Sequence, residues 1–183
     1  MSLQETAARL GGHQWMEQAV WKVLGAWGAS TGDPAAAVLL DTHAQHAAWR
    51  AQQWWERLPV LAVIERDALV RPPSGAIAGL VEQLATAGPD ATVARMAAAY
   101  RVLLARLLAG YSREAHLLSP VSDGPARRTL AQAESDASAD WRAGESFLQR
   151  LLTDASAVDQ AASTVADLER LLALRDPAGE AVQ

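Results

Sequence analysis

The side chains that could carry chemistry lie on the predicted inner faces of three helical segments. Glu17 is surrounded by apolar residues at helical spacing, and Glu134 lies in a similar stripe much later in the chain. His43 and His46 are three positions apart, so they share one face of a helix. Two imidazoles with carboxylates are suitable ligands for Fe, Mn or Zn. If the fold brings these four residues together, they form a mononuclear metal site that could activate water or dioxygen.

A second interpretation of the same residues needs no metal. Polar side chains inside a protein require hydrogen-bonding partners, and this set can supply them to one another. Glu17 could accept a hydrogen bond from His43 or His46, and Arg50 could pair with Glu134. This interpretation is favoured, so the expected cofactor is none, with Fe, Mn or Zn as the alternative. No catalytic residue is assigned, and whether the protein is an enzyme stays open.

Helices must position these residues, because alanine and leucine dominate the sequence and favour helix. Glycine and proline clusters divide the chain into long helical segments at residues 2–27, 34–57, 90–118 and 125–152. A crossover at 59–89 carries a short helix, and a fifth helix follows at about 156–174. We therefore expect one domain over residues 1–175 and a flexible tail at 176–183.

The lengths of the connections predict how the long helices are arranged. Short turns join the first to the second and the third to the fourth, so each pair packs antiparallel. The crossover between the pairs, at 59–89, is long enough to run the length of a bundle. The predicted fold is an all-α, antiparallel four-helix bundle with one long crossover and a C-terminal fifth helix.

This layout, together with its inward polar residues, resembles the ferritin-like superfamily over about residues 2–152. Members with two irons use a carboxylate from the first helix, Glu-x-x-His from the second, a carboxylate from the third and Glu-x-x-His from the fourth. Glu17 matches the first place, and Glu134 keeps the glutamate of the fourth. His43 and His46 keep the spacing of the second, with histidine in place of glutamate.

The chain departs from that pattern in two further places. Ala137 stands where the fourth helix would carry its histidine, and Leu107 and Leu108 stand at the level of the third-helix carboxylate. The resemblance therefore implies a ferritin-like bundle without an ordinary di-iron centre.

Seven tryptophans are many for 183 residues, and three on each of the first two helices cannot all face one core. Tryptophan is enriched at protein interfaces, because it buries a large area at low entropic cost. One interpretation is an aromatic surface that binds a second copy or another protein, formed by Trp15, Trp21, Trp49, Trp54 and Trp55. The alternative is that the crossover and the fifth helix cover these side chains.

Composition excludes several classes of function. There is no cysteine, which excludes disulfides and thiolate chemistry. The net charge of −5 without a basic cluster disfavours nucleic-acid binding. No apolar stretch reaches the roughly 20 residues of a membrane span, and the start lacks a signal-peptide pattern, so a cytoplasmic location is expected.

Three hypotheses on function follow. The first is an interaction or scaffold protein that lacks catalytic metal and associates through its tryptophans. The second is a metal-dependent, oxidoreductase-like enzyme. The third is a bundle that binds a small molecule in a cavity lined by tryptophan, histidine and glutamate.

Overall fold

The computed structural model describes residues 3–60, 62 and 64–175. Within this part of the chain the regular structure is entirely helical, without a β-strand. The predicted tail at 176–183 and the start of the predicted helix 2–27 lie outside the described residues. The elements are α1 (Leu3–Ser30), α2 (Pro34–Arg57), α3 (Arg66–Leu69), α4 (Gly75–Ala87), α5 (Thr92–Ala97), η1 (Ala98–Leu103), α6 (Leu104–Leu117), α7 (Gly124–Leu151) and α8 (Ala155–Arg175).

Local chemistry sets the bounds of α2. The Asp33 carboxylate accepts hydrogen bonds from the backbone N–H groups of Ala35 and Ala36 at 2.8 and 2.9 Å, and Pro34 opens the helix. The helix ends at Arg57 because Leu58 precedes a proline and adopts an extended backbone. The predicted segment 34–57 is therefore confirmed.

The predicted helix 90–118 is continuous in direction but contains a π-helical segment. This segment, η1, lies between α5 and α6 and carries the buried Tyr100. The Tyr100 ring packs directly on Gly144 of α7, where an added Cβ would lie 2.1 Å from the ring. A glycine in mid-helix is therefore needed here for the close approach of α7 to η1.

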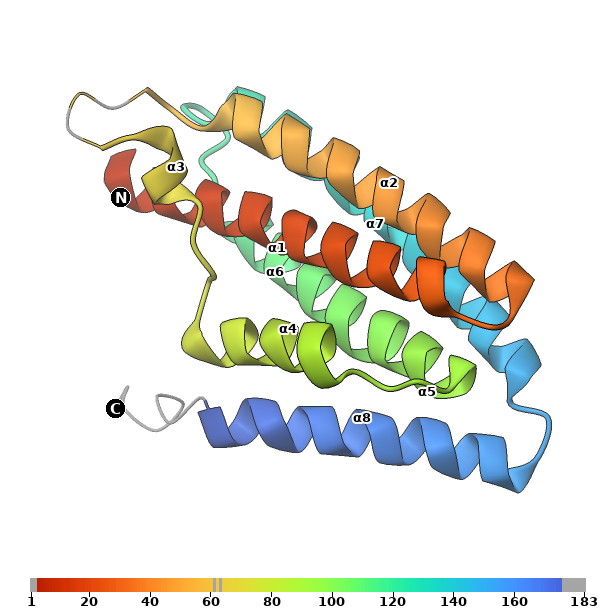
Figure 1. Ribbon diagram of the computed structural model, residues 1–183. Helices are drawn as coiled ribbons and strands as arrows, with labels where there is room; N and C mark the ends of the chain where they lie inside the picture. The colour runs from red at the N-terminus through yellow and green to blue at the C-terminus, as the bar shows by residue number, and fades with distance from the viewer. Residues whose placement is uncertain (1–2, 61, 63, 176–183) are drawn as a thin grey trace.

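Four of these elements enclose the main core. Helix α1 packs against α2 and α6, and α7 packs against the same two helices. Figure 1 shows that α1 and α2 run in opposite directions, as do α6 and α7, whereas α2 and α6 run in the same direction. Helices α4 and α8 pack on each other beside α1 and η1, and their Leu80, Leu84 and Leu168 belong to the same hydrophobic cluster as the main core.

The segment between α2 and α5 crosses the molecule from one end to the other (Figure 1). It contains α3 and then α4, and the N-cap residue of α4, Ser74, accepts a hydrogen bond from the Ile77 N–H at 3.2 Å. None of the helices in the described ranges has the length and hydrophobicity that crossing a membrane requires.

Candidate functional site

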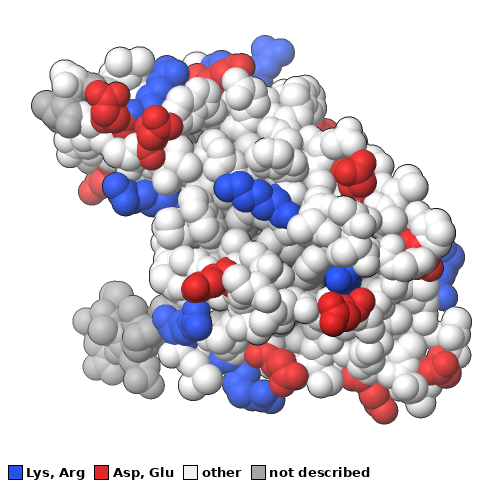
Figure 2. Space-filling view, in the orientation of Figure 1, with Lys and Arg blue, Asp and Glu red and all other residues white. Residues whose placement is uncertain are grey.

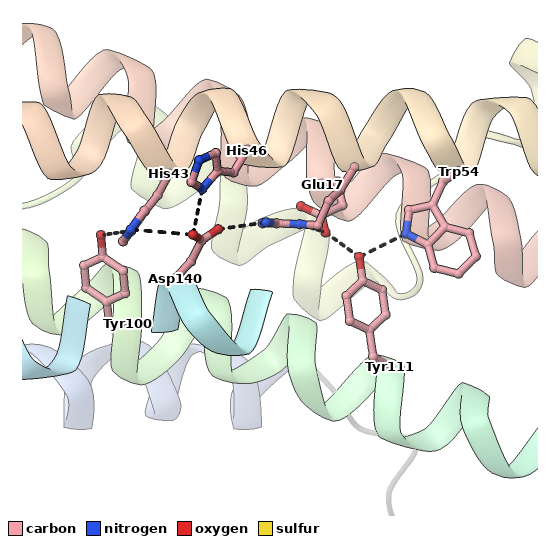
Figure 3. Close-up of polar contacts among 8 residues, drawn as sticks. Glu17, His43, His46, Trp54, Tyr100, Tyr111 and Asp140 are labelled. Atoms are coloured by element: carbon pink, nitrogen blue, oxygen red, sulfur yellow. Dashed lines mark hydrogen bonds and ion pairs between the residues drawn. The ribbon is translucent and has the colours of Figure 1, made fainter. Parts of the chain in front are cut away.

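A buried arginine holds two carboxylates together inside the bundle. Arg50 of α2 donates from Nε to Glu17 Oε1 of α1 and from Nη1 to Asp140 Oδ2 of α7, each at 2.7 Å (Figure 3). The side chains of Arg50 and Glu17 are fully buried, and that of Asp140 is 6% exposed. Charge-assisted hydrogen bonds of this length are strong, so this triad ties three helices to one another.

Further hydrogen bonds extend the triad toward α6. The Tyr111 hydroxyl donates to Glu17 Oε1, and Trp54 Nε1 donates to the Tyr111 oxygen at 3.0 Å. Trp54 lies four residues after Arg50 on α2, so the two side chains share one face of that helix. The network thus ends in two aromatic side chains at the α6 side of the core.

Two histidines and a tyrosine form the other end of the network. His46 Nδ1 lies 2.8 Å from Asp140 Oδ1, and His43 Nε2 lies 3.6 Å from the same oxygen. His43 Nδ1 lies 2.7 Å from the Tyr100 hydroxyl of η1. The His46 side chain is 51% exposed, so the network reaches solvent at this residue.

Burial sets the protonation preferences within the network. It raises the pKa of Glu17, although the charge of Arg50 opposes this. It also raises the pKa of Tyr111 well above its ordinary value, and the neighbouring Glu17 carboxylate adds to this, so the phenol stays a hydrogen-bond donor. Burial lowers the pKa of His43, partly offset by the charge of Asp140.

The structure brings together only part of the predicted site. Glu17, His43 and His46 all belong to this network, but Glu134 does not. Glu134 is half-exposed, and its carboxylate lies 3.5 Å from the Ser112 hydroxyl on the outside of α6.

Asp140 is the α7 residue that fills the place predicted for Glu134. The expected pairing of Arg50 with Glu134 was therefore wrong, as was that of Glu17 with His43 or His46. The buried face of α7 consists of residues spaced three or four positions apart: Ala126, Leu130, Ala133, Ala137, Asp140, Gly144 and Leu148. Glu134 is one position beyond Ala133, about 100° around the helix. The run of small residues on that face was the signal that could have identified Asp140.

The donor set does not fit Fe, Mn or Zn. Within the described residues no three His, Asp or Glu side chains are grouped so that they could hold a metal ion. Glu17 Oε2 is buried without a hydrogen-bond partner, but so is Nη2 of Arg50, whose guanidinium lies against the same carboxylate. A divalent cation bound to Glu17 would face this fixed positive charge.

A groove of about 870 Å³ lies between α1, the residues at 64–77, α6 and α8. Figure 2 shows the outline of the molecule indented at this end, where the α3 region faces the layer of α4 and α8. The apolar lining of the groove includes Met16, Leu69, Ile77, Leu107 and Leu172.

A buried glutamate is one of the polar residues that line the groove. Glu114 is 2% exposed; it accepts from Arg9 Nε at 2.9 Å and lies 3.5 Å from His13 Nε2. Burial raises the pKa of Glu114, but the hydrogen bonds of His13 and Arg9 outweigh this and lower the pKa below its ordinary value. The His13 ring stacks on Trp54 with centroids 5.0 Å apart, so the groove borders the buried network.

The five tryptophans of the predicted surface differ in their exposure. Trp54 is fully buried and does not belong to the predicted surface, because its indole lies in the network. Trp21 and Trp49 are 44% and 54% exposed. Trp15 and Trp55 line an open depression of about 430 Å³ whose rim includes Val70 of the crossover segment.

The comparisons with known proteins do not extend this description. No family model matches the chain, and no curated protein and no solved structure matches it.

Proposed function

We propose that this chain is a ferritin-like bundle that binds a small organic molecule in the groove between α1, α6 and α8. The ferritin-like assignment is supported by the order of packing, in which α1 and α7 each contact both α2 and α6. It is also supported by the segment that contains α4. This segment runs along the length of the molecule and connects the antiparallel pair α1 and α2 to the antiparallel pair α6 and α7 (Figure 1).

The groove itself is the observation that carries the binding function. Its volume of about 870 Å³ is within the range of ligand sites, roughly 300–1,000 Å³. Such sites combine an apolar lining with a few placed polar groups. Here the apolar lining surrounds the ion-paired Glu114, whose carboxylate is held in place by Arg9.

Filling the groove tests this function. Gly110 of α6 lines it, and an added Cβ there would meet only His13 Cε1, at 3.8 Å. We expect wild-type protein to bind 1-anilinonaphthalene-8-sulfonate saturably, measured by its fluorescence, and Gly110→Phe to weaken binding by about tenfold or more.

Gly25→Phe is the matched control. Gly25 is also a helix glycine with one contact at 3.8 Å, to Ala44, but it does not line the groove. Circular dichroism confirms that both variants fold. Equal affinity in both variants and the wild type would contradict the proposal.

A second candidate is association with another copy of the chain through the exposed tryptophans. Indoles that are half-exposed on neighbouring helices are a typical feature of interfaces. We expect sedimentation velocity to show a dimer that dissociates in the double variant Trp21→Gln, Trp49→Gln. A wild type that remains monomeric throughout the micromolar range would exclude this candidate.

A further inference from the structure

The charge of the groove differs in sign from the charge of the protein. Its lining contains Arg9, Arg71, Arg106 and Arg113 against Glu114 and Glu169, a formal balance of 4 − 2 = +2. The whole chain carries −5. A positive concavity in an acidic protein attracts anions, and its low-dielectric walls strengthen this attraction.

Two of the four arginines carry this excess charge. Arg9 is paired with Glu114, and Arg106 with Glu169. Arg71 donates from Nε to a backbone oxygen, that of Ala68, at 2.8 Å. Within the described ranges no ion pair joins Arg71 or Arg113 to a carboxylate. Guanidinium groups suit planar anions, because they present two parallel donors.

An apolar wall lies beside these charges. Leu117, which lines the groove, is 42% exposed, and Ile64 and Ile77 in the same lining are partly exposed. A ligand that is only an inorganic anion would leave this wall in contact with water. A ligand with a hydrocarbon part would bury it, at about 25 cal/mol per Å² of apolar area.

We propose that the ligand is an amphipathic anion, a carboxylate or sulfonate on a hydrocarbon body. Its head group contacts Arg71 or Arg113, and its body lies along Ile64, Ile77 and Leu117. This inference rests on the proposed function, because it names the chemical class of ligand for the same groove.

The test compares ligands that share one hydrocarbon tail. Isothermal titration of the full chain with decanoate, decanol and decylammonium is expected to give the tightest binding for decanoate, by about tenfold over decanol. Arg113→Gln and Arg71→Gln are each expected to weaken the binding of decanoate and to leave the binding of decanol unchanged. Arg142→Gln, at an exposed position of α7 outside the groove, is the charge-matched control and is expected to change neither.

The outcomes separate this inference from the proposed function. Equal affinity for decanoate and decanol, or tighter binding of decylammonium than of decanoate, would overturn the claim that the ligand is an anion. The proposal that the groove binds a small molecule would still stand. Absence of binding for all three, together with no effect of Gly110→Phe, overturns both.

The anionic head could also belong to a lipid in a membrane. The groove lies between α1, the residues at 64–77, α6 and α8. This position between elements favours a free molecule, so we expect no retention on vesicles of phosphatidylglycerol or of phosphatidylcholine. Retention on phosphatidylglycerol alone, without binding of monomeric decanoate, would overturn the assignment to a free ligand.

Discussion

Arg50→Met is expected to destabilise the protein by about 3–5 kcal/mol in urea unfolding near neutral pH. Methionine fills much of the same volume, but it leaves Glu17 and Asp140 buried without their shared cation. When one partner of a buried ion pair is removed, the remaining charge stays buried, and no attraction offsets the free energy of removing it from water. Here two carboxylates lose their shared cation at once, although Asp140 keeps its contact with His46 and Glu17 keeps the hydrogen bond from Tyr111.

The control removes the charges as well as the cation. The triple variant Arg50→Met, Glu17→Gln, Asp140→Asn is expected to recover most of the lost stability, since no unpaired charge remains buried. A loss below about 1 kcal/mol in the single variant would show that Arg50 does not hold the bundle together.

The free energy of unfolding of the single variant Arg50→Met is expected to depend on pH. Burial raises the folded-state pKa of Glu17 above 4.5, and without Arg50, whose charge lowers that pKa, it rises further. The folded variant therefore binds a proton at pH values where the unfolded chain does not. The loss of stability of Arg50→Met relative to wild type should therefore become smaller as the pH falls through the folded-state pKa of Glu17 toward 4.5. A loss of stability that does not change with pH would contradict this.

Adjacent glycines on α1 are expected to respond to alanine in opposite directions. A Cβ at Gly11 would lie 2.0 Å from the backbone oxygen of Leu69, whereas the nearest atom to a Cβ at Gly12 is 3.8 Å away, on Pro73. Gly11→Ala must displace the α3 segment and should cost about 1–3 kcal/mol. Gly12→Ala should gain up to about 1 kcal/mol from helix propensity.

Urea unfolding of the two variants measures this difference. Because Leu69 also lines the groove, Gly11→Ala should weaken 1-anilinonaphthalene-8-sulfonate binding even where the variant is fully folded. Equal stability of Gly11→Ala and Gly12→Ala would mean that the α3 segment does not pack on α1 as described.

The helices could be predicted from the sequence because their boundaries depend on local chemistry. Asp33 and Pro34 start α2, Ser74 caps α4, and proline follows the end of α2 at Leu58. The fifth helix, predicted at about 156–174, is α8 at Ala155–Arg175. None of these features requires knowledge of distant residues.

The site could be predicted only in part, because it depends on which face of each helix points inward. The predicted inner face of α7 was displaced by one position, so it included Glu134 and left out Asp140. Glu17 and His43 are buried, as predicted. The π-helical turns of η1 could not be predicted either, because nothing in the alanine-rich sequence indicates them. The groove depends on packing between segments far apart in sequence, so no local pattern predicts it.

Binding in the groove is the central claim, and chemical-shift mapping tests it most directly. In a ¹H–¹⁵N titration with decanoate, the amides of Gly12 and Gly110 should shift most, while those of Gly25 and Gly32 and the indole of Trp49 should not move. Shifts centred on Trp21 and Trp49, or no saturable shift at Gly110, would contradict it.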